Sequence, residues 1–347
     1  MNLKHFLFLF ALLWSTAVQA SRDFIFFLFS DIHVGAENLK ANPPATREQS
    51  VARVKANLDV MRDLVGQPWP VGSKDAISVP QGLMILGDVS DGHQEIPRHQ
   101  EQWSSFGELF PETGVRFGKA KVPVFAIAGN HDGPVAGPAR QGLLLRNRTL
   151  QKAGQLAALS SNGVHYALNC SGVHFIFLGL CPADTTDTET PFKFGTPGTG
   201  SWNDPQGAFS FLKDYLGRRV GKSGEPVVIL QHYGFDGFSL NDWNWWTLKQ
   251  RRALYDLLKG YNIAAIVHGH NHHAEHYRWP DPKLHAADLE FFFNGKRPVS
   301  FRQYDILSCG NVCWVIRVRG DQLLGVNYKG PDWAADSAAS FMKSLKP

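Results

Sequence analysis

The chain has 347 residues, with 35 Lys and Arg against 31 Asp and Glu and a formal net charge of +4. Charged residues make up 19% of it and hydrophobic residues 44%, which excludes a disordered acidic chain and a polybasic nucleic-acid-binding arm. The length fits one large α/β domain or two smaller ones, with a sizeable core.

Residues 1–20 have the pattern of a secretory signal peptide. Lys4 is followed by an apolar run over residues 6–14, and Val18 and Ala20 stand where cleavage requires small side chains. The run is too short to span a bilayer, and an uncleaved N-terminal anchor is the alternative. No later stretch reaches membrane-spanning length, so we expect an exported protein, secreted or periplasmic, with one domain over residues 21–347.

Short and nearly continuous apolar runs predict strands that are buried on both faces. These runs cover residues 24–29, 83–86, 122–128, 173–180, 227–230 and 263–267. Between them, apolar residues recur at intervals of three and four, which predicts helices over residues 47–65, 140–158, 205–219 and 246–258. Strands that alternate with helices are typical of layered α/β proteins.

From about residue 300 the pattern changes to alternating runs with Gly-containing turns between them. Residues 302–307, 312–319 and 322–328 therefore predict a closing set of antiparallel strands. Two of the four cysteines, Cys309 and Cys313, flank one of these turns and are candidates for a cross-strand disulfide, with buried free thiols as the equal alternative. A strand between Cys170 and Cys181 would hold them too far apart to bond.

Polar side chains that bind metals follow five of the predicted buried strands. They are Asp31 and His33, Asp88, Asn130 with His131 and Asp132, His232, and His270 with His272. In open α/β sheets, sites form outside the carboxyl ends of the strands, so we expect these residues to converge on one sheet edge. Carboxylates, an amide oxygen and imidazoles together suit Mn, Fe, Zn or Co better than Mg or Ca.

The ordered motifs Asp31-Ile32-His33, Gly87-Asp88, Gly129-Asn130-His131-Asp132, His232 and Gly269-His270-Asn271-His272 resemble the calcineurin-like metallophosphoesterases. The resemblance covers about residues 24 to 330 and implies a four-layer α/β/β/α sandwich with two transition-metal ions, divalent or trivalent. The chain does not resemble the purple acid phosphatase branch of this family. That branch has a tyrosine where Asp91 stands here, and it lacks the histidine that is present here as His33.

The resemblance also implies roles for the matching residues. One ion would be held by Asp31, His33, Asp88 and His272, and the other by Asp88, Asn130, His232 and His270, so that Asp88 bridges the two. A water or hydroxide between the ions would attack phosphorus. His131 would act as the general acid, and Asp132 would orient it.

These observations predict an exported dinuclear hydrolase of phosphate esters, with a slight preference for monoesters. A phosphodiesterase acting on nucleotide or phospholipid head-group esters is the alternative, and a non-catalytic secreted protein that binds phosphate or lipid through metal is an alternative of another class. The expected partner is a small phosphate ester or a lipid, and scattered basic residues give no nucleic-acid groove. An aromatic stretch over residues 233–246 predicts either a wall beside the metals or ordinary core packing.

Overall fold

The computed structural model describes residues 22–37, 46–70, 75–92, 96–185, 203–242, 245–309, 313–328 and 340–347. The expected signal peptide and residues 243–244 of the aromatic stretch lie outside the described residues. Within those ranges, no helix combines the length and the apolar character that crossing a membrane requires.

Two large sheets form the centre of the molecule. The first has the strand order β17-β16-β15-β1-β2-β5, with β1 (Asp23–Phe29), β2 (Gly82–Leu86), β5 (Val124–Ile127), β15 (Cys313–Arg319), β16 (Gln322–Tyr328) and β17 (Ser340–Ser344). The second has the order β11-β14-β10-β9-β8-β7-β6, with β6 (Ala158–Leu159), β7 (Tyr166–Cys170), β8 (Val173–Phe177), β9 (Val227–Leu230), β10 (Ile263–His268), β11 (Glu275–Trp279) and β14 (Tyr304–Ser308). β1, β2 and β5 are parallel, as are β8, β9, β10 and β14.

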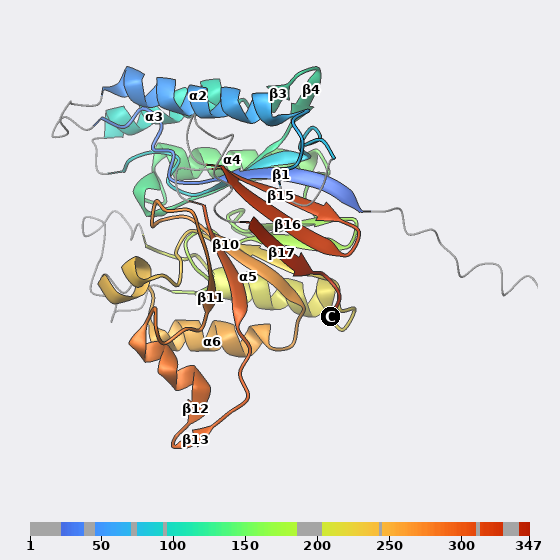
Figure 1. Cartoon of the computed structure of the whole chain (residues 1–347). Helices are drawn as coiled ribbons and strands as arrows, with labels where there is room; N and C mark the ends of the chain where they lie inside the picture. Colours follow the sequence, from blue (N-terminus) through green and yellow to red (C-terminus); the bar gives the residue numbers. More distant parts are fainter. Residues whose placement is uncertain are drawn as a thin grey trace, which may run out of the picture.

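Helices cover the outer face of each sheet (Figure 1). On the first sheet these are α2 (Arg47–Leu64), α3 (Ile96–Leu109) and α4 (Pro138–Lys152), and on the second they are α5 (Ala208–Tyr215) and α6 (Leu248–Leu258). Two short hairpins stand apart from the large sheets, one of β3 (Val115–Phe117) and β4 (Ala120–Val122), the other of β12 (Phe293–Asn294) and β13 (Arg297–Pro298).

Three hydrophobic cores separate the four layers, and β1 shows how the sequence builds two of them. Successive side chains of a strand point to opposite faces. Accordingly Ile25, Phe27 and Phe29 pack against α2 and α3 in the outer core, whereas Phe24 and Phe26 enter the core between the sheets. The third core lies between the second sheet and α5 and α6. This arrangement confirms the expected α/β/β/α sandwich.

Several element boundaries differ from those expected. The strand expected over residues 122–128 is divided, because Pro123 separates β4 from β5. α4 ends at Lys152 rather than near residue 158, and Gly154 follows it with a φ of +70°. α3 was not expected, and its inward face mixes the buried polar residues His99, Gln102 and Ser105 with the apolar Phe106.

The C-terminal strands do not form the single antiparallel set that their sequence predicts. β15, β16 and β17 are antiparallel neighbours in the first sheet. β14 instead lies in the second sheet, parallel to β10 and antiparallel to β11. Cys309 and Cys313, which follow β14 and begin β15, are both buried and free, so the disulfide expectation is not met and the free-thiol alternative holds.

Candidate metal centre

The predicted metal-binding residues meet where the carboxyl ends of strands from both sheets face one another. Asp31, Asp88 and Asn130 follow β1, β2 and β5 of the first sheet. His232 and His270 follow β9 and β10 of the second sheet. The sequence-based expectation of one sheet edge was therefore wrong in this respect, since two sheets supply the residues.

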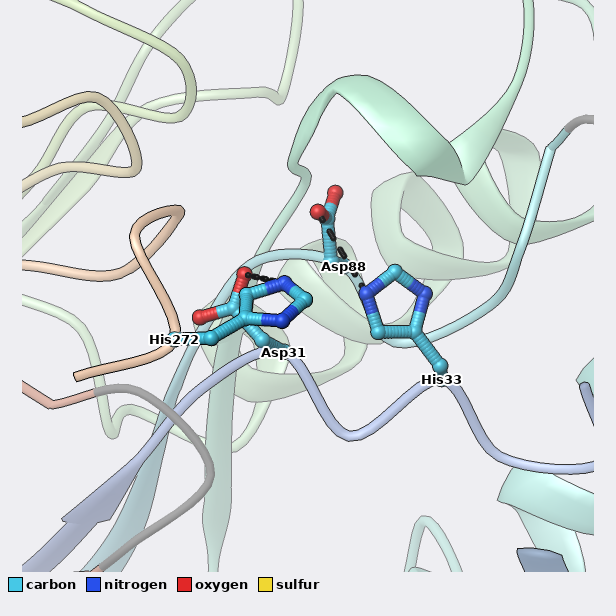
Figure 2. Close-up of side chains that lie close together, drawn as sticks. All are labelled: Asp31, His33, Asp88 and His272. Atoms are coloured by element: carbon cyan, nitrogen blue, oxygen red, sulfur yellow. Dashed lines mark ion pairs between the residues drawn. The ribbon is translucent and has the colours of Figure 1, made fainter. Parts of the chain in front are cut away.

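One half of this site, which we call the open half, consists of Asp31, His33 and His272 together with Asp88. Each residue offers one ligand atom, and these atoms all lie within 4.8 Å of one another. His272 Nε2 lies 3.5 Å from Asp31 Oδ1, and His33 Nε2 lies 3.8 Å from Asp88 Oδ2 (Figure 2). The side chain of His272 is 48% exposed, so solvent reaches this half directly.

The other half, which we call the enclosed half, consists of Asn130, His232 and His270 together with Asp88. Ligand atoms of Asp88, His232 and His270 lie within 4.8 Å of one another, and all three residues are buried. His232 Nε2 lies 2.9 Å from Asn130 Oδ1 and 3.3 Å from Asp88 Oδ2. Its other ring nitrogen, Nδ1, lies 2.8 Å from the Leu86 carbonyl, a contact that orients the ring with Nε2 toward Asp88.

The backbone is strained at the same residues. Seven non-glycine residues in the described ranges have positive φ, and five of them are Asp31, His33, Asp88, His270 and His272. Left-handed backbone at such residues is unfavourable and persists where the surrounding structure enforces it, often at functional sites. The strain therefore supports a functional role for these five residues, independently of their side-chain chemistry.

Glycines let the strand-end loops approach each other closely. A Cβ at Gly87, whose φ is +93°, would collide with Nδ1 of His232, and a Cβ at Gly129 would collide with Oδ1 of Asp88. Backbone hydrogen bonds hold the same loops in place: the amide of His33 donates to the Asp88 carbonyl at 3.0 Å, and the amide of Gly269 donates to the His232 carbonyl at 3.1 Å.

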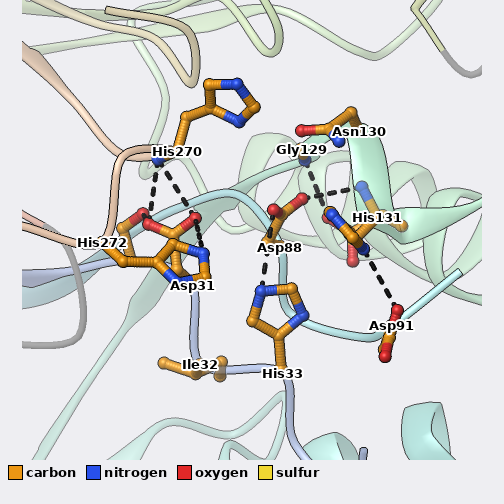
Figure 3. A network of polar contacts seen from close by, with 12 residues as sticks. Asp31, Ile32, His33, Asp88, Asp91, Gly129, Asn130, His131, His270 and His272 are labelled. Carbon is orange, nitrogen blue, oxygen red and sulfur yellow. Dashed lines mark hydrogen bonds and ion pairs between the residues drawn. The ribbon is translucent and has the colours of Figure 1, made fainter. Parts of the chain in front are cut away.

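The donor set fits transition-metal ions. Three buried ligand atoms, His33 Nε2, Asp88 Oδ2 and His270 Nε2, have no hydrogen-bond partner among the described residues. Buried polar atoms are rarely left unpaired in native proteins unless a ligand or ion satisfies them. Asp88 is a member of both halves, and its Oδ1 accepts the amide of His131 at 2.8 Å, which orients the carboxylate between them (Figure 3).

The electrostatics keep two of these imidazoles neutral. Burial lowers the pKa of His33 to about 4 and the pKa of His270 well below its ordinary value. Burial also opposes ionisation of Asp88, but the imidazoles of His232 and His131 outweigh it and hold that carboxyl's pKa well below its usual range. A charged carboxylate beside neutral imidazoles is the protonation state in which these groups bind metal.

His131 contacts a different carboxylate from the one expected. Its Nδ1 lies 3.1 Å from Asp91 Oδ1 (Figure 3). Asp132 instead accepts hydrogen bonds from the amides of Gly129, at 2.7 Å, and Ser90, at 2.9 Å. Asp132 therefore supports the loop that carries Asn130, and Asp91 takes the orienting position that the sequence analysis had given to Asp132.

Sequence reasoning missed the residues that support Asp91. Gln102 Oε1 accepts the Asp91 amide at 2.8 Å, and His99 Nε2 lies 3.1 Å from the Asp91 carbonyl. Both come from α3, a helix that the sequence analysis did not predict. The spacing of Asp91, three residues after Asp88, was visible in the sequence and was the available signal.

Aromatic rings surround His270. The ring centroids of Tyr233 and Trp245 each lie 4.7 Å from that of His270, and the centroid of Phe238 lies 5.1 Å away. Tyr233 and Trp245 are buried, whereas Phe238 is 38% exposed. Phe235 instead stacks on Trp279 in the third core. Tyr233, Trp245 and Phe238 thus form a wall beside the candidate metal ligand His270, whereas Phe235 belongs to ordinary core packing.

Comparisons with known proteins give one family. A family model described as calcineurin-like phosphoesterase matches residues 25–274. A solved structure of a dimetal phosphatase from Danio rerio is similar, with a TM-score of 0.55 and 14% identity, covering 93% of this chain and 99% of that one. GAP50, the anchor in the inner membrane complex of Plasmodium, aligns at 10% identity and a TM-score of 0.49, covering 94% of this chain and 90% of that one. No curated protein matches the sequence.

Proposed function

Because the chain belongs to the calcineurin-like phosphoesterase family and is a phosphoric ester hydrolase, we propose that it is an exported dinuclear enzyme that prefers phosphate monoesters. The observation that carries the dinuclear proposal is the sharing of Asp88 between two clusters of ligand atoms. The Oδ2 of Asp88 and the Nε2 atoms of His33 and His270, which lack hydrogen-bond partners among the described residues, support it, because bound cations would satisfy all three.

The two halves divide the ligands between the ions. Asp31, His33 and His272 would hold one ion in the open half, and Asn130, His232 and His270 would hold the other in the enclosed half, with Asp88 common to both. When bound, two such cations supply Lewis-acid activation of water as the nucleophile and neutralise charge on the phosphoryl oxygens. The ligand set accepts Mn, Fe, Zn or Co.

His131 and Asp91 provide the acid chemistry. Burial opposes a charge on His131, but Asp88 and the hydrogen-bonded Asp91 outweigh it and raise its pKa. The raised pKa favours the protonated imidazole, which can give its proton to the leaving oxygen of the ester. Its Nδ1 is held by Asp91, so Nε2 is the nitrogen available to the substrate.

Export rests on the sequence of residues 1–20, where Lys4, an apolar run and the small residues Val18 and Ala20 form the signal-peptide pattern. N-terminal sequencing of the protein recovered from the extracytoplasmic fraction tests this proposal. A mature protein that begins at Ser21 supports it, and a protein that retains Met1 or its neighbours contradicts it.

Phosphodiesterase activity is the second candidate, and the exposed ring of Phe238 favours it. This ring lies beside His270 at the edge of the enclosed half and could contact the second ester group of a lipid or nucleotide. The two candidates share every ligand, so the preferred ester separates them.

The deciding experiment compares initial rates on p-nitrophenyl phosphate and bis(p-nitrophenyl) phosphate, using the mature protein with Mn²⁺ and Asp88→Asn as the control. Faster turnover of the monoester that is lost in the variant supports the proposal. Faster turnover of the diester supports the second candidate. If the protein holds two metals and neither ester reacts, the non-catalytic binding alternative is favoured instead.

A further inference from the structure

The β12–β13 hairpin forms a projection on the helical side of the second sheet. Residues 293–302 are exposed without interruption, and Figure 1 shows this hairpin extending outward beyond α6. We call residues 293–302 the tip. It is far along the chain from the strand-end loops that carry Asp31, Asp88 and Asn130, and none of the predicted metal ligands belongs to it.

Large apolar side chains are concentrated on and beside the tip. In the described ranges, eight large hydrophobic residues are exposed, and four of them lie within residues 289–301. They are Leu289, Phe293, Val299 and Phe301, with exposures of 52%, 39%, 39% and 43%. Scattered exposed hydrophobic residues need no explanation, but half of them on or directly beside one short projection do.

The charge of the tip has a single sign. Lys296, Arg297 and Arg302 are basic, and residues 291–303 contain no Asp or Glu. The described ion pairs do not involve Lys296 or Arg297. Two cations at the turn are therefore left facing solvent beside exposed aromatic and aliphatic side chains.

The tip has a defined conformation at its base. Phe292 and Phe301 pack ring against ring with centroids 3.9 Å apart, and the amide of Val299 donates to the Phe292 carbonyl at 2.9 Å. Arg252 of α6 donates to the Glu290 carbonyl at 3.2 Å, which attaches the base to the body. The apolar side chains beyond this base are presented on a preformed support.

The other two-stranded sheet in the described part of the chain shows that such exposure is not general. β3–β4 also turns through Gly and Lys, at Gly118 and Lys119. Its large side chains, Val115, Phe117 and Val122, are nevertheless buried in the outer core. The sequence of β12–β13 thus places comparable side chains in water where β3–β4 buries them.

We propose that the tip binds an anionic lipid surface, with Phe293 and Val299 entering the interfacial region and Lys296 and Arg297 contacting lipid phosphates. A convex projection that combines apolar rings with cations is complementary to such a surface, where burial of apolar area and attraction to anionic head groups act together. A nucleic-acid backbone would use the cations but not the aliphatic side chains. This inference does not depend on the ester that the enzyme prefers.

The test is co-sedimentation of the mature protein with vesicles of phosphatidylcholine that contain about one-third phosphatidylglycerol, against vesicles of phosphatidylcholine alone. We expect binding to the anionic vesicles and its weakening at high salt. Lys296→Glu with Arg297→Glu is expected to weaken binding at least about tenfold. Phe293→Ser with Val299→Ser is expected to weaken it by a similar factor, because both side chains would lose apolar burial.

Matched controls distinguish the tip from the general positive charge of the chain. Lys119→Glu with Lys121→Glu reverses two exposed charges on the other hairpin, and Met342→Ser removes an apolar side chain that is 68% exposed on β17. Neither is expected to change binding. An unchanged thermal melting midpoint verifies that each variant is folded. Absence of binding to anionic vesicles, equal weakening by the controls, or an apolar variant that binds like wild type would each overturn the proposal.

Discussion

The open and enclosed halves of the metal centre share Asp88 but differ in their access to solvent. In the open half His272 is 48% exposed, whereas His232 and His270 of the enclosed half are buried. Aromatic rings of Tyr233 and Trp245 cover His270, and His272 has solvent beside it. Each half has two imidazoles and shares Asp88, and the two differ in one ligand, the carboxylate of Asp31 against the amide of Asn130. The difference in exposure comes from what surrounds the ligands.

One set of motifs thus builds two candidate metal positions with unequal access to solvent. The packed, low-dielectric surroundings of the enclosed half would slow the release of a bound metal ion to water. A metal ion in the open half could leave without any movement of the core.

Asp88→Asn should remove activity almost completely. The change takes a negative charge from both halves at once, so metal binding and the neutralisation of the phosphoryl group are both weakened. We expect turnover of p-nitrophenyl phosphate to fall at least about 10³-fold and the bound metal to fall in both halves. Steady-state rates and elemental analysis measure these effects. A variant that retains its metal and half of its activity would contradict the shared role of Asp88.

His270→Ala and His272→Ala should each remove a different metal ion. The two ions should differ in how fast they leave the wild-type protein. When the wild-type protein is placed in excess chelator, we expect a fast phase of metal loss from the open half and a slow phase from the enclosed half. His272→Ala should lack the fast phase and His270→Ala the slow phase, with activity reduced about 10²-fold in both. A single phase in wild type, or the same missing phase in both variants, would show that the halves are equivalent.

The pH dependence of metal uptake should also separate the halves. Burial opposes a charge on His232, but Asp88 outweighs it and raises the pKa of His232 to about 9 in the metal-free protein. A metal ion needs the neutral imidazole, so binding below that pH must displace a proton. The affinity of the enclosed half should therefore fall as pH decreases from about 9, by about tenfold per pH unit.

The open half should not show this proton competition at His33, because burial lowers its pKa to about 4 and it is neutral throughout the same range. Metal titrations at several pH values measure the two affinities. The steep dependence should persist in His272→Ala and disappear in His270→Ala. Equal slopes for both variants would exclude His232 as the source.

Phe238→Ala should have the smallest effect and should act on specificity. Phe238 is the exposed ring beside His270, so its loss removes apolar contact without removing a ligand. We expect the KM for a naphthyl phosphate ester to rise about fivefold, while kcat on that ester changes little. Met342→Ala, on β17, is the matched control for an exposed apolar side chain. No change in KM would exclude Phe238 as a contact of the substrate.

Much of the fold could be predicted because its strands are buried on both faces. Residues 24–29, 83–86, 227–230 and 263–267 lie in β1, β2, β9 and β10, since continuous apolar runs leave few other solutions. α3 could not be found in the same way. Its inward face mixes the polar His99 and Gln102, which contact Asp91, with the apolar Phe106, so no continuous apolar run marks it.

The residues of the candidate site were predicted from local motifs as well. The prediction failed for contacts between segments that are distant in sequence. Short motifs such as Asp31-Ile32-His33 carry both the residue types and their spacing, and the structure brings all seven predicted ligands together. The pairing of His131 with Asp91 instead of Asp132 depends on how the 88–92 and 129–133 loops face each other. The assignment of β14 to the second sheet likewise depends on partners far along the chain.

By itself, the sequence determined which strands are buried, which polar residues follow them and which family they belong to, because strand burial and ligand chemistry are properties of short segments. Only the tertiary structure decided that two sheets share the site, that Asp91 orients His131 and that the two halves differ in exposure. These outcomes depend on packing between segments that are distant in sequence, such as α3 against the Asp91 turn and Trp245 against His270. Local patterns carry no record of those contacts.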